Sequence, residues 1–95
     1  MSLKELSPPP LAQEVNSQEV LRVWAGEGLP QQCALVTTWQ DPANWGLLLV
    51  DIARHAARAY ANESPISEQQ ALERIKVGFD AEWSFATDGG QQVQG

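Results

Sequence analysis

Two stretches near the start of the sequence alternate between polar and apolar residues, as β-strands do. Residues 19–25 alternate with a period of two and contain β-branched and aromatic side chains, so they predict a strand. Residues 33–39 repeat the pattern and predict a second strand. The residues between them, 26–30, contain two glycines and a proline, which is typical of a turn. We therefore expect an antiparallel hairpin with a loop of several residues.

The period of the apolar residues changes from two to three or four directly after the second strand. Asp41 is a suitable N-cap, and Pro42 fits the first helical position because its missing N–H would be unpaired there anyway. The pattern predicts a helix from Pro42 to about Ala61. Its expected core-facing residues share one side: Trp45, Leu48, Leu49, Ile52, Ala56 and Ala59.

A second helix is predicted after Asn62-Glu63-Ser64-Pro65. Ser67 and Gln70 have the spacing of a capping box, in which each side chain bonds the other residue's backbone N–H. The apolar residues that follow recur at helical spacing and are expected to face the core: Ala71, Leu72, Ile75, Phe79 and Trp83.

The element order predicts an α+β fold of the ββαα type. We expect one domain over residues 19–86, a flexible Pro-containing leader over 1–18 and a disordered tail over 87–95. Ser7-Pro8-Pro9-Pro10 could alternatively bind an aromatic groove, but no basic residue flanks the prolines.

So small a domain builds only a small core, and with Cys33 as its single cysteine the chain can form no internal disulfide. A two-stranded hairpin also exposes both of its edges. We therefore expect a homodimer, in which two hairpins pair edge to edge in a four-stranded sheet.

The formal net charge is −6 at pH 7, and this balance argues against two classes of partner. Nucleic acids and anionic membrane surfaces are both bound mainly through Lys and Arg. The N-terminus has no apolar segment typical of a signal peptide, and no apolar run is long enough to span a bilayer. Together with the unpaired Cys33, these features predict a cytoplasmic protein.

Asp51 and His55 are the residues with the clearest potential for chemistry. They lie four apart on the first predicted helix, so a carboxylate could orient an imidazole as in general-base catalysis. No nucleophile motif accompanies them, and a metal site would need further ligands. We expect His55 to be a partly buried histidine bonded to a neighbour, and we predict no catalytic residue, no metal and no cofactor.

Two further groups of residues are candidates for binding. Arg54 and Arg58, also four apart, could hold a carboxylate or phosphate, but we favour the interpretation as an exposed helix side with local ion pairs such as Asp51–Arg54. Of the four tryptophans, Trp45 and Trp83 are expected in the core. Trp24 and Trp39 are the interface candidates.

Two segments together resemble a known bacterial family. These are Glu19-Val20-Leu21-Arg22-Val23-Trp24 and the run from Asp41-Pro42-Ala43-Asn44-Trp45-Gly46 to Asp51-Ile52-Ala53-Arg54-His55. They resemble a domain of unknown function, DUF5076, over about residues 19–84. The resemblance implies one compact intracellular domain and carries no functional residue with it.

The sequence thus leaves two hypotheses for function. The first is a non-enzymatic interaction or regulatory module that acts through self-association or a protein partner. The alternative is a small-molecule or anion-binding protein, or a minor enzyme, with its site around Asp51, Arg54, His55 and Arg58.

Overall fold

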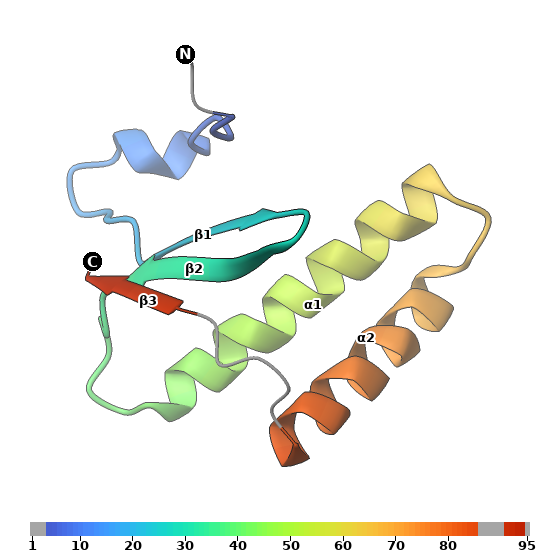
Figure 1. The fold of residues 1–95 in the computed structure, drawn as a ribbon. Coiled ribbons are helices and arrows are strands. Elements are labelled where there is room, and N and C mark those ends of the chain that lie inside the picture. Colours follow the sequence, from blue (N-terminus) through green and yellow to red (C-terminus); the bar gives the residue numbers. More distant parts are fainter. Residues whose placement is uncertain (1–3, 86–90, 95) are drawn as a thin grey trace. The chain divides into compact units, whose positions relative to one another are not determined.

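The computed structural model confirms the ββαα order and adds two short elements to it (Figure 1). It describes residues 4–85 and the backbone of residues 91–94. The elements in chain order are η1 (Pro10–Gln13), β1 (Leu21–Gly26), β2 (Leu29–Leu35), α1 (Ala43–Glu63), α2 (Glu68–Ser84) and β3 (Gln91–Gln94). The chain divides into two units, one formed by residues 1–38 with 90–95 and the other by residues 39–89.

The turn between β1 and β2 is tighter than the sequence predicted. Gly26 pairs with Leu29, which leaves two residues for the turn. Gly28 has a φ of 74°, in the left-handed region that glycine adopts readily, so the chain reverses there at once. As a result β2 begins at Leu29 and ends at Leu35, whereas the predicted second strand covered residues 33–39.

Proline within β2 is accommodated by an irregularity in strand pairing. The register between β1 and β2 shifts between Trp24 and Gly26, and Pro30 lies opposite this shift. Because proline has no N–H to donate, it fits in a strand at such an irregular position. The sequence analysis placed Pro30 in the turn, and this was wrong, because Pro30 lies within β2.

A third strand, β3, pairs in parallel with β2, with Gln32 opposite Gln91 and Leu35 opposite Gln94. The sheet order is therefore β1-β2-β3, and β1 is an edge strand. The sequence analysis placed no strand here, in its predicted tail. A strand of three glutamines and one valine lacks the apolar alternation by which strands are recognised.

The second long helix begins where capping chemistry predicts, whereas α1 begins at Ala43, one residue later than predicted, with Pro42 as its N-cap. The Asp41 carboxylate accepts a hydrogen bond from the backbone N–H of Ala43 at 3.0 Å. At the second helix, Oγ of Ser67 accepts from the N–H of Gln70 at 3.0 Å, and the N–H of Ser67 donates to the Gln70 side chain at 2.8 Å. The predicted capping box is therefore confirmed.

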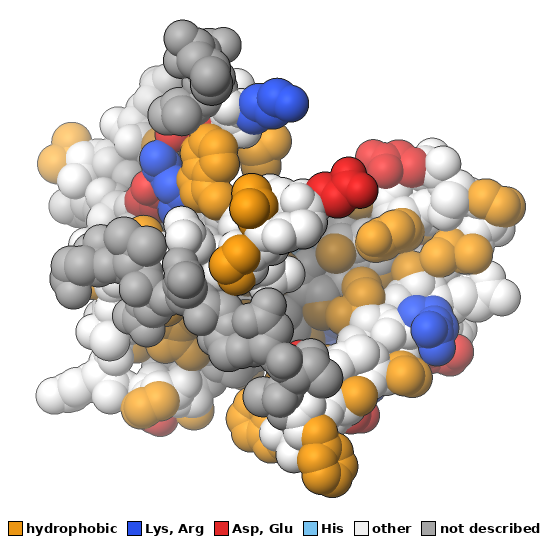
Figure 2. All heavy atoms as spheres, viewed as in Figure 1, with side chains coloured by type: hydrophobic (Ala, Val, Ile, Leu, Met, Phe, Trp, Pro, Cys, Tyr) orange, Lys and Arg blue, Asp and Glu red, His pale blue; other side chains and the backbone are white. Residues whose placement is uncertain are grey.

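The helices pack against each other through small residues. Ala57 on α1 and Ala71 on α2 are 0% and 2% exposed, and they are the buried hydrophobic residues of the part of the chain that the structure describes. Leu49 and Ile52, which the sequence analysis placed in the core, are exposed. Figure 2 shows hydrophobic side chains at the surface along both helices. A single chain therefore leaves much of its apolar surface in water.

We predict that Ser67→Ala lowers the free energy of unfolding by about 1 kcal/mol, because the first turn of α2 loses its cap. Urea denaturation followed by circular dichroism measures the change. Ser7→Ala, in the exposed leader, is the control and should alter stability by less than about 0.5 kcal/mol. Equal effects of the two variants would show that the capping box does not stabilise α2.

Candidate functional site

Helix α1 brings the four predicted site residues to one side. Asp51, Arg54, His55 and Arg58 follow one another at spacings of three, one and three residues, and α1 is continuous through them. Residues three and four apart are neighbours on a helix surface. All four side chains are exposed.

The ion pair on this side of α1 differs from the predicted one. Nε of Arg58 lies 3.9 Å from Oε1 of Glu68, at the start of α2. Among the described residues, Asp51 and Arg54 form no ion pair with each other. Both members of the observed pair are about half exposed, so the solvent screens them and the pair adds little to stability.

His55 is exposed rather than partly buried as predicted, and the described residues provide no hydrogen bond to its imidazole. It lies on the solvent side of α1, because the face that packs on α2 is the one that carries Ala57. An imidazole in open water has neither an orienting partner nor a site that excludes water, and both are usual for general-base catalysis.

The tryptophans are distributed differently from the prediction. Trp83, expected in the core, is 79% exposed and stacks on Phe79 with ring centroids 5.5 Å apart and planes at 21°. Its position one residue before the end of α2 was the signal in the sequence that could have indicated this exposure.

The two interface candidates are both partly exposed, but their surroundings differ. Trp24 lies on the edge strand β1. Trp39 lies beyond β2 and packs edge-on against Trp45, with ring centroids 5.8 Å apart and planes at 76°. Trp39 is therefore part of the packing around the start of α1, and Trp24 is a strand residue of nearly the same exposure, 37% against 38%.

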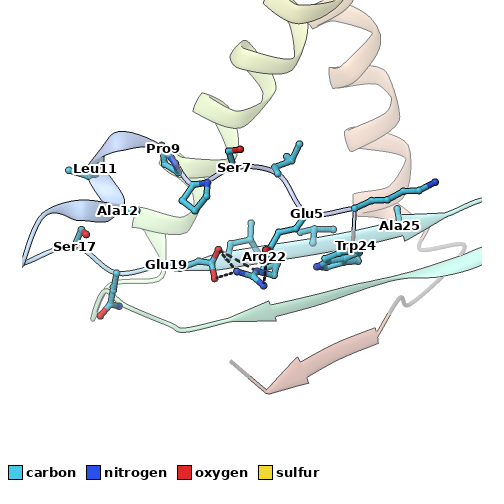
Figure 3. Close-up of a pocket in the computed structure, with 16 residues that line it drawn as sticks. Glu5, Ser7, Pro9, Leu11, Ala12, Ser17, Glu19, Arg22, Trp24 and Ala25 are labelled. Atoms are coloured by element: carbon cyan, nitrogen blue, oxygen red, sulfur yellow. Dashed lines mark hydrogen bonds and ion pairs between the residues drawn. The ribbon is translucent and has the colours of Figure 1, made fainter. Parts of the chain in front are cut away.

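A hollow of about 840 Å³ lies between the N-terminal leader and β1 (Figure 3). Arg22 crosses it, with Nη1 2.7 Å from Oε2 of Glu5 and Nη2 3.0 Å from Oε1 of Glu19. Leu11 and Trp24 contribute apolar lining. The sequence analysis did not identify this cluster, although the Glu19–Arg22 spacing was visible in the sequence. Because Arg22 is already bound by two carboxylates, it is not a free cation for a ligand.

The described residues contain no group of three or more His, Cys, Asp or Glu side chains that could hold a metal ion. Within the same residues, no helix is both long and apolar enough to cross a membrane. The carboxylates of Glu5 and Glu68 already form ion pairs, with Arg22 and Arg58 respectively.

Comparison with known proteins shows that this chain matches a known family. The family model described as "Domain of unknown function (DUF5076)" matches residues 5–87, a wider range than the resemblance in the sequence suggested. No curated protein matches.

A solved structure is also similar over nearly its whole length. It is described as that of a "putative pyruvate dehydrogenase from the photosynthetic bacterium Rhodopseudomonas palustrus CGA009". The two sequences are 46% identical, the match covers 95% of this chain and 92% of that one, and the TM-score is 0.73. The chain therefore belongs to the family described as the domain of unknown function DUF5076.

Proposed function

We propose that this protein is a non-enzymatic, cytoplasmic interaction module that acts through self-association. The observation that carries the proposal is the burial pattern. Ala57 and Ala71 are the hydrophobic residues buried in the described part of the chain, while larger side chains such as Leu47, Phe79 and Trp83 are exposed. Exposed apolar surface on this scale is typical of an interaction site.

The size of the domain supports the same proposal. A core this small contributes only a few kcal/mol, typically under about 5, so small domains usually need a further source of stability. The single cysteine cannot supply an internal disulfide. Association of two copies would cover apolar surface and add the missing burial.

The exposed residues on α1 support a non-enzymatic role. An enzyme must hold its substrate and its reacting groups away from bulk water. Asp51, Arg54, His55 and Arg58 are instead exposed on a convex helix surface.

One observation favours the alternative, an anion-binding role. The guanidinium groups of Arg54 and Arg58 are exposed on the same side of α1, with the imidazole of His55 beside them. Such groups can bind a carboxylate or a phosphate. Glu68 competes for Arg58, and Asp51 repels an anion, so we place this role second.

We predict that the protein is a dimer at tens of micromolar, with a mass of twice 10.4 kDa. Apolar side chains that a single chain leaves in water become buried between two copies, which favours association. Sedimentation velocity or size-exclusion chromatography with light scattering measures the mass. A mass of 10.4 kDa that persists to millimolar protein would overturn the proposal.

We also predict that His55→Ala and Arg58→Ala leave the dimer mass unchanged. Both side chains are exposed and polar, so neither variant should change the free energy of unfolding by more than about 0.5 kcal/mol. The NMR signals of the His55 ring should not move when inorganic phosphate is added. A saturable shift that Arg58→Ala abolishes would instead support the anion-binding alternative.

A further inference from the structure

The N-terminal leader has local structure of its own. Pro9 precedes η1 in polyproline geometry, with a φ of −70° and a ψ of 162°. The backbone N–H groups of Ala12 and Ser17 donate to the carbonyls of Pro9 and Glu14, at 2.9 and 3.1 Å. Figure 3 shows the chain turning back toward β1 beyond η1. Because prolines and local turns restrict the leader, holding it in one place costs less conformational entropy than holding a free chain.

Apolar packing does not hold the leader on the sheet. Its larger apolar side chains, Leu6, Leu11 and Val15, are 91%, 67% and 96% exposed. The hollow of about 840 Å³ also lies between the leader and β1. A side chain that stays in water gains nothing from burial, so another interaction has to keep the leader beside β1.

The Glu5–Arg22 ion pair joins the leader to β1. Nη1 of Arg22 lies 2.7 Å from Oε2 of Glu5, the distance of a charge-assisted hydrogen bond. Glu19 accepts from the other side of the same guanidinium, with Nε and Nη2 of Arg22 at 3.4 and 3.2 Å from its Oε2. Glu19 therefore orients the guanidinium so that Nη1 is directed to the leader (Figure 3).

The charges around the hollow are balanced. Two cations and two carboxylates line it: Lys4, Arg22, Glu5 and Glu19. Their charges cancel, whereas the whole chain carries a net charge of −6. A leader that moves away from β1 takes Glu5 out of this balanced group and into the field of an acidic chain, which repels it. Charge therefore favours the leader beside β1.

We infer that residues 4–18 form a strap that closes over β1, with the Glu5–Arg22 ion pair as its latch. In the closed state the strap lies beside Trp24, which also lines the hollow, and it occupies Nη1 of Arg22. In the open state both groups are accessible from the leader side, so the strap controls access to this part of β1. The match to the family begins at residue 5 and so includes the latch. This inference goes beyond the proposed self-association and does not depend on it.

The latch is weak enough to open. The side chains of Arg22 and Glu5 are 44% and 46% exposed, so the solvent screens the pair, and such a pair favours the closed state by less than about 5-fold. Salt weakens it further, since the Debye length falls from about 30 Å at roughly 0.01 M to about 3 Å at roughly 1 M. The strap is therefore a two-state element that rising ionic strength shifts toward the open state.

Glu5→Gln tests the latch, with the order of the strap measured by ¹⁵N NMR relaxation on the full chain at about 0.01 M salt. In the unmodified protein the amides of Leu6 and Ser7 should have order parameters above about 0.6, the limit below which a backbone is flexible. Glu5→Gln should bring them below about 0.6, because the closed state loses its charge pair.

Glu14→Gln is the matched control. It removes the same charge from an exposed leader carboxylate that, in the part of the chain that the structure describes, forms no ion pair. The order parameters should then stay as in the unmodified protein. Arg22→Gln, the other half of the latch, should loosen the strap as Glu5→Gln does, and the double variant no further, because both changes remove one contact.

Two further readouts are specific to a latched strap. About 1 M salt should loosen the strap of the unmodified protein and leave that of Glu5→Gln unchanged, because the charge pair is what salt screens. Opening should also give a soluble paramagnetic agent greater access to the indole N–H of Trp24, which lines the hollow.

Loosening by Glu5→Gln but not by Glu14→Gln supports the strap. Equal order parameters in the unmodified protein and both variants would overturn it, whether the leader is rigid or flexible, since the ion pair would then hold nothing. Equal loosening by both variants would also overturn it and assign the effect to net charge. Unchanged access to Trp24 after loosening would refute the control of access. Far-UV circular dichroism confirms that each variant stays folded, as expected for a side chain as exposed as that of Glu5.

Discussion

The unit of residues 39–89 depends on one constraint, which is the close packing of α1 against α2 at small buried residues. Ala57 and Ala71 are the residues that the two helices bury. Small side chains let helix axes approach closely, but each buries only about one methyl group, worth roughly 1 kcal/mol. The larger apolar residues then lie beside this line of contact and not within it, as with Leu72 and Ile75, or at its ends, as with Leu47 and Trp83.

This packing explains why the candidate sites differ in character. The polar residues of α1, Asp51 to Arg58, lie on the solvent side of a regular helix, where the spacing of the sequence alone places them together. The stacked pair of Phe79 and Trp83 arises differently, because both rings lie on a part of α2 that stays 46% and 79% exposed although α1 is the longer helix. The first group is held by local structure, and the second is left exposed by the limits of tertiary packing.

The unit of residues 1–38 with 90–95 follows the same division between local and long-range causes. The reversal at Gly28 and the salt bridge of Arg22 with Glu19 involve residues close in the sequence, whereas the salt bridge of Arg22 with Glu5 spans 17 positions. The parallel pairing of β2 with β3 joins residues that are almost sixty positions apart, and the polar sequence of β3 does not encode it.

The sequence by itself determined the ββαα order, the capping box at Ser67 and the alignment of Asp51, Arg54, His55 and Arg58, because each depends on spacings of a few residues. Only the tertiary structure decided that Ala57 is buried as well as the predicted Ala71, that His55 and Trp83 are exposed, and that β3 completes the sheet. Periodicity identifies the apolar side of a helix, but several apolar residues on that side compete for contact with the next helix. Which of them are covered depends on how closely and over what length the two helices meet, and that is settled only when the elements pack.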